Sequence, residues 1–332
     1  MGEGQGGGAQ PSTVNTPRCY DTRHNRSAAV PAMTPDEILK AFDNFRVWQR
    51  GDRRAPHKPL LILMALGNLA RGGKPRAEFA DIEGKLGRLL EEFGPSGSNT
   101  TRHFPFWHLA TDGLWQLNGP AEILARPPGA TPTIGELRSN HISGGFPPEI
   151  QAAFQDNPAL VAEVARRVLD AHFPESIRQD VLDAVGLSLE PADAGGGDPA
   201  ARRRDPSFRE KILLAYEYRC CVCGHDMRLK HQPIALEAAH IKWFQAGGPD
   251  VEQNGLALCS LHHKVFDLGA FTIRPADYIM VFSQHLVGNA EKLLSYHGAS
   301  IQHPQSTSYL PSKEFLDWHE DQVFKKPGRD AI

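Results

Sequence analysis

Apolar residues recur at helical spacing through most of the first 186 residues, and this pattern predicts a mainly helical region. The first expected helix has Thr34 as its N-cap and Pro35 at its first helical position, both typical of helix starts. The second carries the apolar run LLILMALGNLA and ends at a pair of glycines. The expected helices cover 35–48, the stretch from Pro59 to Gly72 and Gly73, 79–93, and 149–171.

An aromatic stretch, FPFWHLATDGLWQL at 104–117, interrupts the helical pattern. Its aromatics favour strands, and Asp112 with Gly113 is a turn sequence, so a short hairpin is expected there. The last third of the chain has another order of elements. It predicts a helix at 206–218, a strand at 234–243, a loop at 246–255, a helix at 256–266 and a last helix from Ser312 to Phe324.

Residues 187–205, LSLEPADAGGGDPAARRRD, separate the two regions by their composition. Three consecutive glycines, prolines and a charge run without apolar periodicity are typical of a linker. A length of 332 residues also favours two folded units. We expect an α+β protein with a flexible tail at 1–30, a mainly helical domain with a short hairpin at 31–186, the linker at 187–205, and a second domain at 206–332.

The formal net charge of −3 excludes a generally basic protein, so any binding of nucleic acid depends on local patches. One such patch runs from Arg46 to Lys58, where five cations accompany the single anion Asp52. No apolar run approaches the roughly 18 residues of a membrane span, and the first thirty residues lack the apolar core of a secretory signal. A cytoplasmic location without a membrane partner is expected.

The five cysteines are odd in number and three are crowded together, which is unlike a disulfide framework. Cys220 and Cys223 have C-x-x-C spacing, and Cys259 with His262 repeats it as C-x-x-H. Four ligands in two such pairs suit a closed tetrahedral zinc site, so a structural zinc knuckle is predicted. On a helix, His263 points about 100° away from His262 and is expected to face a second site.

The run E-A-A-H-I at 237–241 ends in His240, and Asn254 and His263 follow it on either side of the second ligand pair. In this order and setting the three residues resemble the H-N-H triplet of HNH endonucleases, and the resemblance spans 206–332. It implies a ββα-metal nuclease domain that hydrolyses phosphodiester bonds in DNA.

The resemblance implies that His240 is the general base, a role that an imidazole with a pKa near neutrality suits. His263 is expected to bind a catalytic Mg²⁺ or Mn²⁺, and Asn254 either completes the metal shell or fixes the loop that orients His240. Many HNH enzymes have an acidic ligand directly before the base, where this chain has Ala239. Further ligands must then come from Asp267, Glu237 or water, and strand alternation places Glu237 on the face opposite His240.

Three segments of the first domain resemble the sulfur-binding domain of phosphorothioate-dependent restriction endonucleases: APHKPLLIL at 55–63, RHFPFWHL at 102–109 and SNHISGGF at 139–146. In that family the domain precedes an HNH nuclease. The resemblance implies that the partner is double-stranded DNA in which sulfur replaces a nonbridging phosphate oxygen.

Sulfur keeps the phosphate charge but is larger, softer and less hydrated than oxygen, so a site that reads it must combine cations with a small apolar surface. Trp107 and Trp115 fit the core better than a contact surface, as does Phe106. The candidate DNA-contacting residues are Arg50, His57, Lys58, Arg102, Phe104, Pro105, His108, Arg138 and His141.

Two alternatives remain open at this stage. The first domain could direct the nuclease to methylated or unmodified DNA, where a base reader needs a deep aromatic pocket. The chain could instead be a DNA-binding protein whose nuclease is inactive. A homodimer would suit double-strand cleavage, and nothing in the sequence measures it.

Overall fold

The computed structural model describes Met1 and residues 33–48, 51–127, 129–189 and 205–330. The chain from Met33 to Ile332 forms one compact unit. The expected tail, most of the expected linker and Arg50 lie outside the described residues. Within the described part, no helix is both long and apolar enough to cross a membrane.

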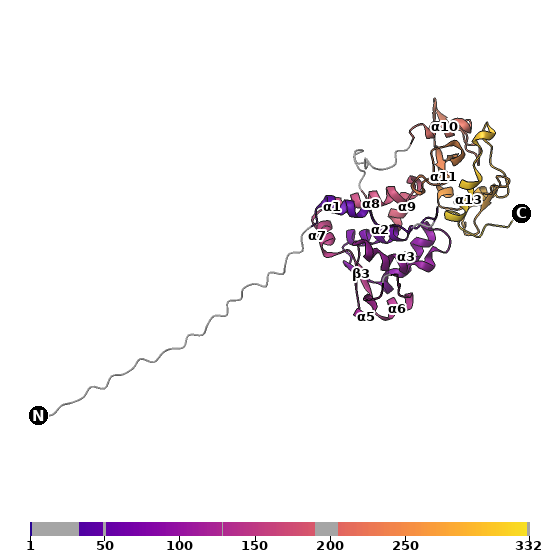
Figure 1. Ribbon diagram of the computed structural model, residues 1–332. Helices are drawn as coiled ribbons and strands as arrows, with labels where there is room; N and C mark the ends of the chain where they lie inside the picture. The colour runs from indigo at the N-terminus through magenta and orange to yellow at the C-terminus, as the bar shows by residue number, and fades with distance from the viewer. Residues whose placement is uncertain (2–32, 49–50, 128, 190–204, 331–332) are drawn as a thin grey trace. The chain divides into compact units, whose positions relative to one another are not determined.

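Helices make up most of the region before residue 190 (Figure 1). The first, α1, begins as predicted: the Thr34 side chain accepts from the Glu37 backbone N–H, and the Glu37 carboxylate accepts from the Thr34 backbone. The helices are α1 Pro35–Asp43, α2 His57–Ala70, α3 Phe79–Phe93, α4 His103–His108, α5 Ala121–Leu124, α6 Ile134–Ser139, α7 Pro148–Asp156, α8 Pro158–His172 and α9 Glu175–Val185.

Two of the predicted helices have different bounds. The helix predicted at 35–48 ends at Asp43, because the chain turns away at Asn44 and the Arg46 backbone N–H bonds to Asp112, 3.2 Å away. The stretch predicted as one helix at 149–171 is two, α7 and α8. Pro158 lacks the N–H that a continuous helix would need and starts the second one instead.

The hairpin predicted at 104–117 is wrong. Its first half is helical, with α4 followed by a 3-10 turn at Leu109–Asp112, and its second half supplies one strand. That strand, β2 Gln116–Asn118, joins a three-stranded antiparallel sheet with the order β1-β3-β2, in which β1 is Arg76–Glu78 and β3 is Ser143–Gly145. Gly144 on the central strand has to be glycine, since a Cβ there would lie 2.2 Å from the Trp115 indole nitrogen.

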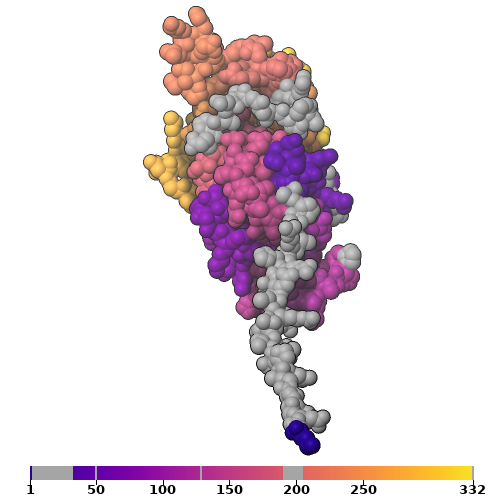
Figure 2. Space-filling model, turned by 90° about the vertical axis from the view of Figure 1, so that its left-hand side faces the viewer, coloured from indigo at the N-terminus to yellow at the C-terminus, as the bar shows by residue number. Residues whose placement is uncertain are grey.

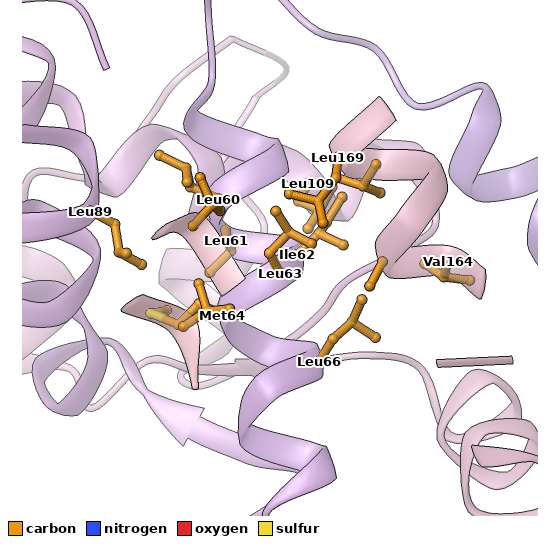
Figure 3. Packing of buried hydrophobic residues seen from close by; sticks show 14 of the residues in the cluster. Leu60, Leu61, Ile62, Leu63, Met64, Leu66, Leu89, Leu109, Val164 and Leu169 are labelled. Atoms are coloured by element: carbon orange, nitrogen blue, oxygen red, sulfur yellow. The ribbon is translucent and has the colours of Figure 1, made fainter. Parts of the chain in front are cut away.

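The core of this region is built around α2, which packs against α3, α8 and α9 (Figure 1). Five consecutive residues of α2, from Leu60 to Met64, are buried, so every side of this helix is covered (Figure 3). Phe106 and Trp115 also lie in this core, as predicted, with ring centroids 5.9 Å apart. Burial of α2 from Pro59 to Met64 gives its first residues, His57 and Lys58, a fixed position at the helix start.

The region after residue 205 has short strands and helices around a separate cluster of buried residues. Its helices are α10 Phe208–Ala215, α11 Ser260–Asp267, α12 Glu291–Leu294 and α13 Lys313–Gln322. Its strands pair in antiparallel twos: β4 Arg228–Leu229 with β5 Gln232–Pro233, β6 Leu236–His240 with β7 Gly255–Cys259, and β8 Phe271–Ile273 with β9 Met280–Phe282.

The helix predicted at 256–266 is only partly correct. Residues 255–259 are strand β7, fully buried and paired with β6 from Leu236↔Cys259 to His240↔Gly255, and the helix starts after it at Ser260. A short buried apolar run has no periodicity that separates strand from helix, so the sequence could not decide this boundary. The order β6, β7, α11 is the ββα unit that the nuclease resemblance implied.

Candidate active site, zinc cluster and DNA-contacting residues

Four side chains from the two predicted ligand pairs meet in one cluster. The ligand atoms of Cys220, Cys223, Cys259 and His262 all lie within 4.8 Å of one another. The Sγ atoms of Cys223 and Cys259 are 4.0 Å apart, and Nδ1 of His262 is 3.0 Å from the Cys259 Sγ and 3.6 Å from the Cys220 Sγ. A tetrahedral zinc with Zn–S bonds of about 2.3 Å needs sulfur spacings of about 3.8 Å, so the donor set and its geometry fit zinc.

The residues next to these ligands point elsewhere. Cys221 is buried outside the cluster, and burial raises the pKa of its thiol, as for an inert structural cysteine. His263 turns away from His262 toward the carboxylates of Glu237 and Asp267. The divergence predicted from helix geometry is therefore observed, and the two neighbouring histidines serve different sites.

A cavity of about 560 Å³ opens beside the ββα unit. Both predicted catalytic histidines, His240 and His263, contribute to its wall, and five acidic residues accompany them. The polar residues of its wall that come from the last third of the chain include Arg209, Glu237, His240, Asp250, His263 and Asp267.

His240 lies at the end of β6 and is held from two sides. Its Nε2 is 2.7 Å from Oδ1 of Asp250, and its ring stacks on Phe208 with centroids 4.1 Å apart and an interplanar angle of 15°. Both side chains of the histidine–aspartate pair are largely buried. With Asp250 accepting the Nε2 hydrogen, the proton-accepting nitrogen of the neutral ring is Nδ1.

His263 lies on the first turn of α11 between two carboxylates. Its Nδ1 is 2.6 Å from Glu237 Oε2, and its Nε2 is 3.1 Å from Asp267 Oδ2. Burial alone would lower the pKa of His263, but the charges and hydrogen bonds of Asp267 and Glu237 raise this pKa to about 10. The imidazolium balances only one of the two carboxylate charges, and a divalent cation in place of the proton could balance both.

Asp267 is the most enclosed acid of the site. It is buried, and it accepts hydrogen bonds from the Trp243 indole N–H at 2.9 Å and from the Ser176 hydroxyl. Burial raises the pKa of Asp267, yet the charge and hydrogen bond of His263 and the hydrogen bond from Ser176 hold this pKa below its usual value. Ser176, on α9, also borders the cavity, so the region before residue 190 contributes to the active-site wall.

Asn254 does not line this cavity. It is fully buried, and its amide bonds to the loop 242–249: the oxygen accepts from the Lys242 N–H at 2.8 Å, and the nitrogen donates to the carbonyls of Lys242 and Pro249. This geometry matches the second of its two predicted roles, fixing the loop behind His240.

Two further features of the cavity differ from the sequence analysis. Glu237 lines the same cavity as His240, although strand alternation predicted opposite faces. Two-stranded ribbons twist strongly, and His240 is the last residue of β6, so simple alternation fails there. The residues that the sequence analysis missed are Asp250, Trp243 and Ser176, and only Asp250, in the loop between the two strands, carried any signal.

The predicted DNA-contacting residues cluster at the start of α2 and on α4. His57 Nε2 lies 2.8 Å from the Thr101 hydroxyl, and burial lowers the pKa of this histidine. Lys58 pairs with Asp112. Burial lowers the pKa of His108, and the charge of Lys58 lowers it further. Nε2 of His108 lies 2.8 Å from the Thr131 hydroxyl.

Phe104 is 43% exposed, and its ring meets that of His108 at a centroid distance of 6.0 Å. Pro105, the other apolar residue among the candidate DNA-contacting residues, is buried beneath the surface. The exposed apolar surface at α4 is therefore the Phe104 ring, which lies beside His108, and the Lys58 charge is close enough to lower the pKa of that histidine.

The remaining candidates pair with acids. Arg102 and Arg138 share the buried carboxylate of Glu83, which brings α3, α4 and α6 together. His141 is 78% exposed and lies 3.0 Å from Glu78, with its backbone at φ 49°. The structure thus places most of these cations on carboxylates that a DNA phosphate could replace.

Arg54 connects the two sequence regions. Its guanidinium donates to the backbone oxygens of Phe93, at 2.8 Å, and Gln322, at 3.0 Å, and it lies 3.8 Å from the centre of the Trp243 ring. Burial lowers the pKa of Arg54 to about 9, although Asp267 opposes this shift. The segment before α2 is thereby fixed to the loop that follows His240.

Comparisons with known proteins agree with both resemblances. Residues 35–190 match the family described as ScoMcrA-like, DNA sulfur-binding domain, and residues 220–274 match the HNH endonuclease family. A search of curated proteins finds no match.

Several solved structures are similar at low identity. The sulfur binding domain of ScoMcrA complexed with phosphorothioated DNA is 21% identical, over 45% of this chain and 95% of that one, with a TM-score of 0.40. The corresponding domain of SprMcrA, also complexed with phosphorothioated DNA, is 21% identical, over 47% of this chain and 95% of that one, with a TM-score of 0.39.

The type IV phosphorothioation-dependent restriction endonuclease ScoMcrA is 22% identical over 45% of this chain, with a TM-score of 0.38, and the match spans only 32% of that enzyme. The family matches are the stronger finding. From them, this chain joins a ScoMcrA-like DNA sulfur-binding domain, within residues 35–190, to an HNH endonuclease domain, within residues 220–274.

Proposed function

We propose that this protein is a metal-dependent endonuclease that recognises phosphorothioate-modified DNA and hydrolyses its phosphodiester bonds. The observation that carries the proposal is the cavity wall, where His240 and His263 each bond to a carboxylate within one ββα unit. A general base and a metal-binding imidazole beside a common space are the parts that phosphodiester hydrolysis requires.

In the proposed reaction, His240 takes a proton from the attacking water at Nδ1, while Asp250 holds the ring through Nε2 and Phe208 supports its face. Asn254 keeps the following loop in place through its three bonds to backbone atoms. Arg209 borders the same cavity and can bind a phosphate oxygen.

The carboxylates of Glu237 and Asp267, together with His263, are the residues that would hold Mg²⁺ or Mn²⁺. The ion would stabilise negative charge on the phosphate oxygens. A mixed oxygen and imidazole donor set suits both cations, and Mn²⁺ accepts the imidazole more readily. The Cys220, Cys223, Cys259 and His262 cluster would hold a structural zinc without a part in the chemistry.

For target choice, we propose that the cations at α2 and α4 bind the phosphate and that Phe104 contacts the sulfur. An exposed aromatic ring beside His108, with the Lys58 charge acting on that histidine, combines charge with a dehydrated surface, which an ordinary phosphate oxygen does not favour. Lys58, Arg102 and Arg138 would exchange Asp112 and Glu83 for phosphate oxygens, and His57 and His141 would border the same DNA backbone.

The proposal also contains points that rest on the sequence analysis. They are a division into two domains with the linker at 187–205, a cytoplasmic site of action, where the DNA substrate lies, and a homodimer for cutting both strands.

The proposal can be tested with one duplex made with and without a phosphorothioate in the natural stereochemistry. Tighter binding and Mg²⁺- or Mn²⁺-dependent cutting of the modified duplex are expected. His240→Ala should lower the cleavage rate by about 10²-fold to 10⁴-fold, the usual contribution of a general base, and leave binding intact. Equal affinity for both duplexes would contradict the sulfur assignment, and undiminished cutting by the variant would remove His240 from the mechanism.

A further inference from the structure

We infer that the hairpin of β4 and β5, together with its flanking residues 225–234, binds the DNA duplex close to the cut site. The inference rests on the proposed function, since DNA is then the substrate of the nuclease domain. Figure 2 shows this segment as part of an orange projection from the nuclease region.

The hairpin exposes large apolar side chains at high density. Met227 is 59% exposed, Leu229 67% and Ile234 41%. Single exposed apolar residues are common on protein surfaces, but three within eight residues form a patch that indicates a binding surface. The patch has no cover in the described part of the chain.

The same segment is positively charged. From His225 to Ile234 the charged residues are Arg228 and Lys230 against the single acid Asp226, and all three are exposed. Arg228 lies 5.1 Å from the centre of the Tyr218 ring, on the opposite face of the strand from Leu229. Cations beside apolar side chains suit a nucleic-acid groove, where the cations meet phosphates and the apolar groups meet sugars and base edges.

The turn of the hairpin presents a cation at its tip. Lys230 and His231 form a two-residue turn, and Lys230 has φ 56°, in the left-handed region. Glycine is the usual residue at such a position, and a lysine there costs about 1 kcal/mol. A cation at this position of the turn therefore indicates a role outside the fold.

The root of the hairpin is tied to both metal sites. The Cys220 N–H donates to the His225 carbonyl at 2.9 Å, and the Ile234 N–H donates to the Met227 carbonyl at 2.9 Å. Strand β6, which carries Glu237 and His240, follows directly. Glu237 follows Lys230 by seven positions, so the tip lies at most about 25 Å from the cavity wall. One turn of B-DNA is about 34 Å, which places the tip within one helical turn of the cut phosphate.

A second copy of this chain fits the surface less well. Two such hairpins in contact would bring their cations together, whereas DNA supplies opposite charge along both sides of a groove. A two-stranded β-ribbon also has the width that the major groove admits.

The test uses the full chain in a His240→Ala background, so that bound DNA stays intact. The double variant Arg228→Ala/Lys230→Ala is compared with Lys313→Ala, whose exposed lysine already pairs with Asp317 at 2.9 Å. Binding of the sulfur-modified and unmodified duplexes is measured over a range of KCl concentrations. The slope of log affinity against log salt is expected to fall by about two for the double variant on both duplexes, and to stay unchanged for Lys313→Ala.

Because phosphate contacts are independent of the modification, the affinity ratio between the two duplexes should be the same in all three proteins. Leu229→Ser should weaken binding with an unchanged salt slope. An unchanged slope and affinity in the hairpin variants, while the parent still prefers the modified duplex, would overturn the hairpin assignment alone. A dimer that Leu229→Ser converts to monomer, without loss of DNA affinity, would overturn it in favour of self-association. If the parent prefers neither duplex, the proposed sulfur recognition fails, and the salt slopes still decide the hairpin separately.

Discussion

The two regions of this chain hold their functional side chains by different means. Around α2 and α4, the cations lie at the surface of a large apolar core, and each has an acidic or polar partner that a phosphate can displace. Around the ββα unit, His240 and His263 are themselves largely buried, and their carboxylate partners range from the fully buried Asp267 to the 43% exposed Glu237.

This difference follows from what each region has to do. A binding surface must release its internal partners when DNA arrives, so cations that stay partly open to solvent, such as Arg102 and Arg138, are suitable even though the carboxylate that they share is buried. A catalytic site must keep its base and metal ligands in place throughout the reaction, which buried polar networks achieve. The nuclease region contains only two-stranded sheets in its described part, whereas the first region is built mainly of helices. Its Cys₃His cluster is positioned to replace part of an apolar core.

The largest expected effect separates the two regions through zinc. Cys220→Ser should abolish zinc binding and unfold the nuclease region, since the apparent free energy of such sites is about 10–16 kcal/mol in small zinc peptides. The α2 core contains none of these ligands, so binding of modified DNA should persist. Metal content, limited proteolysis and gel shifts measure the three outcomes.

Cys221→Ala is the matched control, because Cys221 is buried next to Cys220 but lies outside the cluster. It should keep its zinc. A Cys220→Ser protein with full zinc content and an intact nuclease region would contradict the assignment.

A smaller effect should come from acid. Burial lowers the pKa of His319 to about 4, although the hydrogen bond to the Phe266 carbonyl, at 3.1 Å, opposes the shift. Since an unfolded histidine has a pKa of about 6.5, the unfolded state takes up the proton first as pH falls. Stability contributed by neutral His319 is complete above pH 6.5 and is lost between about 6.5 and 4, by up to about 3 kcal/mol.

Urea unfolding at several pH values measures this loss. His319→Gln has no proton to take up there, so its free energy of unfolding should vary less over the same interval. Equal pH dependence in both proteins would show that His319 is not buried in its neutral form.

Arg54 tests how firmly the two regions are joined. Arg54→Ala removes two hydrogen bonds from a charged donor and the contact with Trp243, and it should lower the free energy of unfolding by about 2 kcal/mol. The neighbouring exposed Arg53 is the control, and its alanine variant should stay within about 0.5 kcal/mol of the parent. Equal stabilities of the two variants in urea unfolding would mean that Arg54 contributes no more than a surface residue.

The smallest effect concerns sulfur itself. Because the Phe104 ring is only partly exposed, Phe104→Ala should cost about 1 kcal/mol of affinity for the modified duplex, roughly five-fold, and little for the unmodified one. Val287→Ala changes an exposed apolar residue elsewhere and should alter neither affinity. Loss of affinity by Phe104→Ala that is equal for both duplexes would assign the ring to general DNA contact.

The sequence was a good guide wherever the signal was local. The helix at 79–93 has the predicted bounds, and Thr34 caps α1 as expected, since periodicity and capping depend on neighbouring residues. The meeting of Cys220, Cys223, Cys259 and His262 in one cluster was also predicted, because ligand spacing records which side chains meet.

Features that depend on distant residues could not be predicted. The chain just after α1 is held by a hydrogen bond from the Arg46 backbone N–H to Asp112, 66 positions later in the sequence. The Ser176 hydroxyl donates to Asp267, which is 91 positions later. The buried run at 255–259 forms a strand because β6 pairs with it, not because of its own pattern. The carboxylate that orients His240 lies in a loop, whose course no periodicity describes.

The amide of Asn254 has a consequence for the working life of the enzyme. The next residue is Gly255, where a Cβ would lie 2.1 Å from the Cδ1 atom of the buried Ile212. Glycine is therefore favoured at this position, and the chain has an Asn-Gly pair. Asn-Gly pairs lose ammonia readily when the backbone is free to move, and asparagine is among the thermolabile residues. The folded loop prevents this by holding both atoms of the amide, but each heating cycle exposes the pair. A carboxylate formed there would face the Lys242 and Pro249 carbonyls and repel them, so heat damage to this nuclease should accumulate at one amide rather than reverse on cooling.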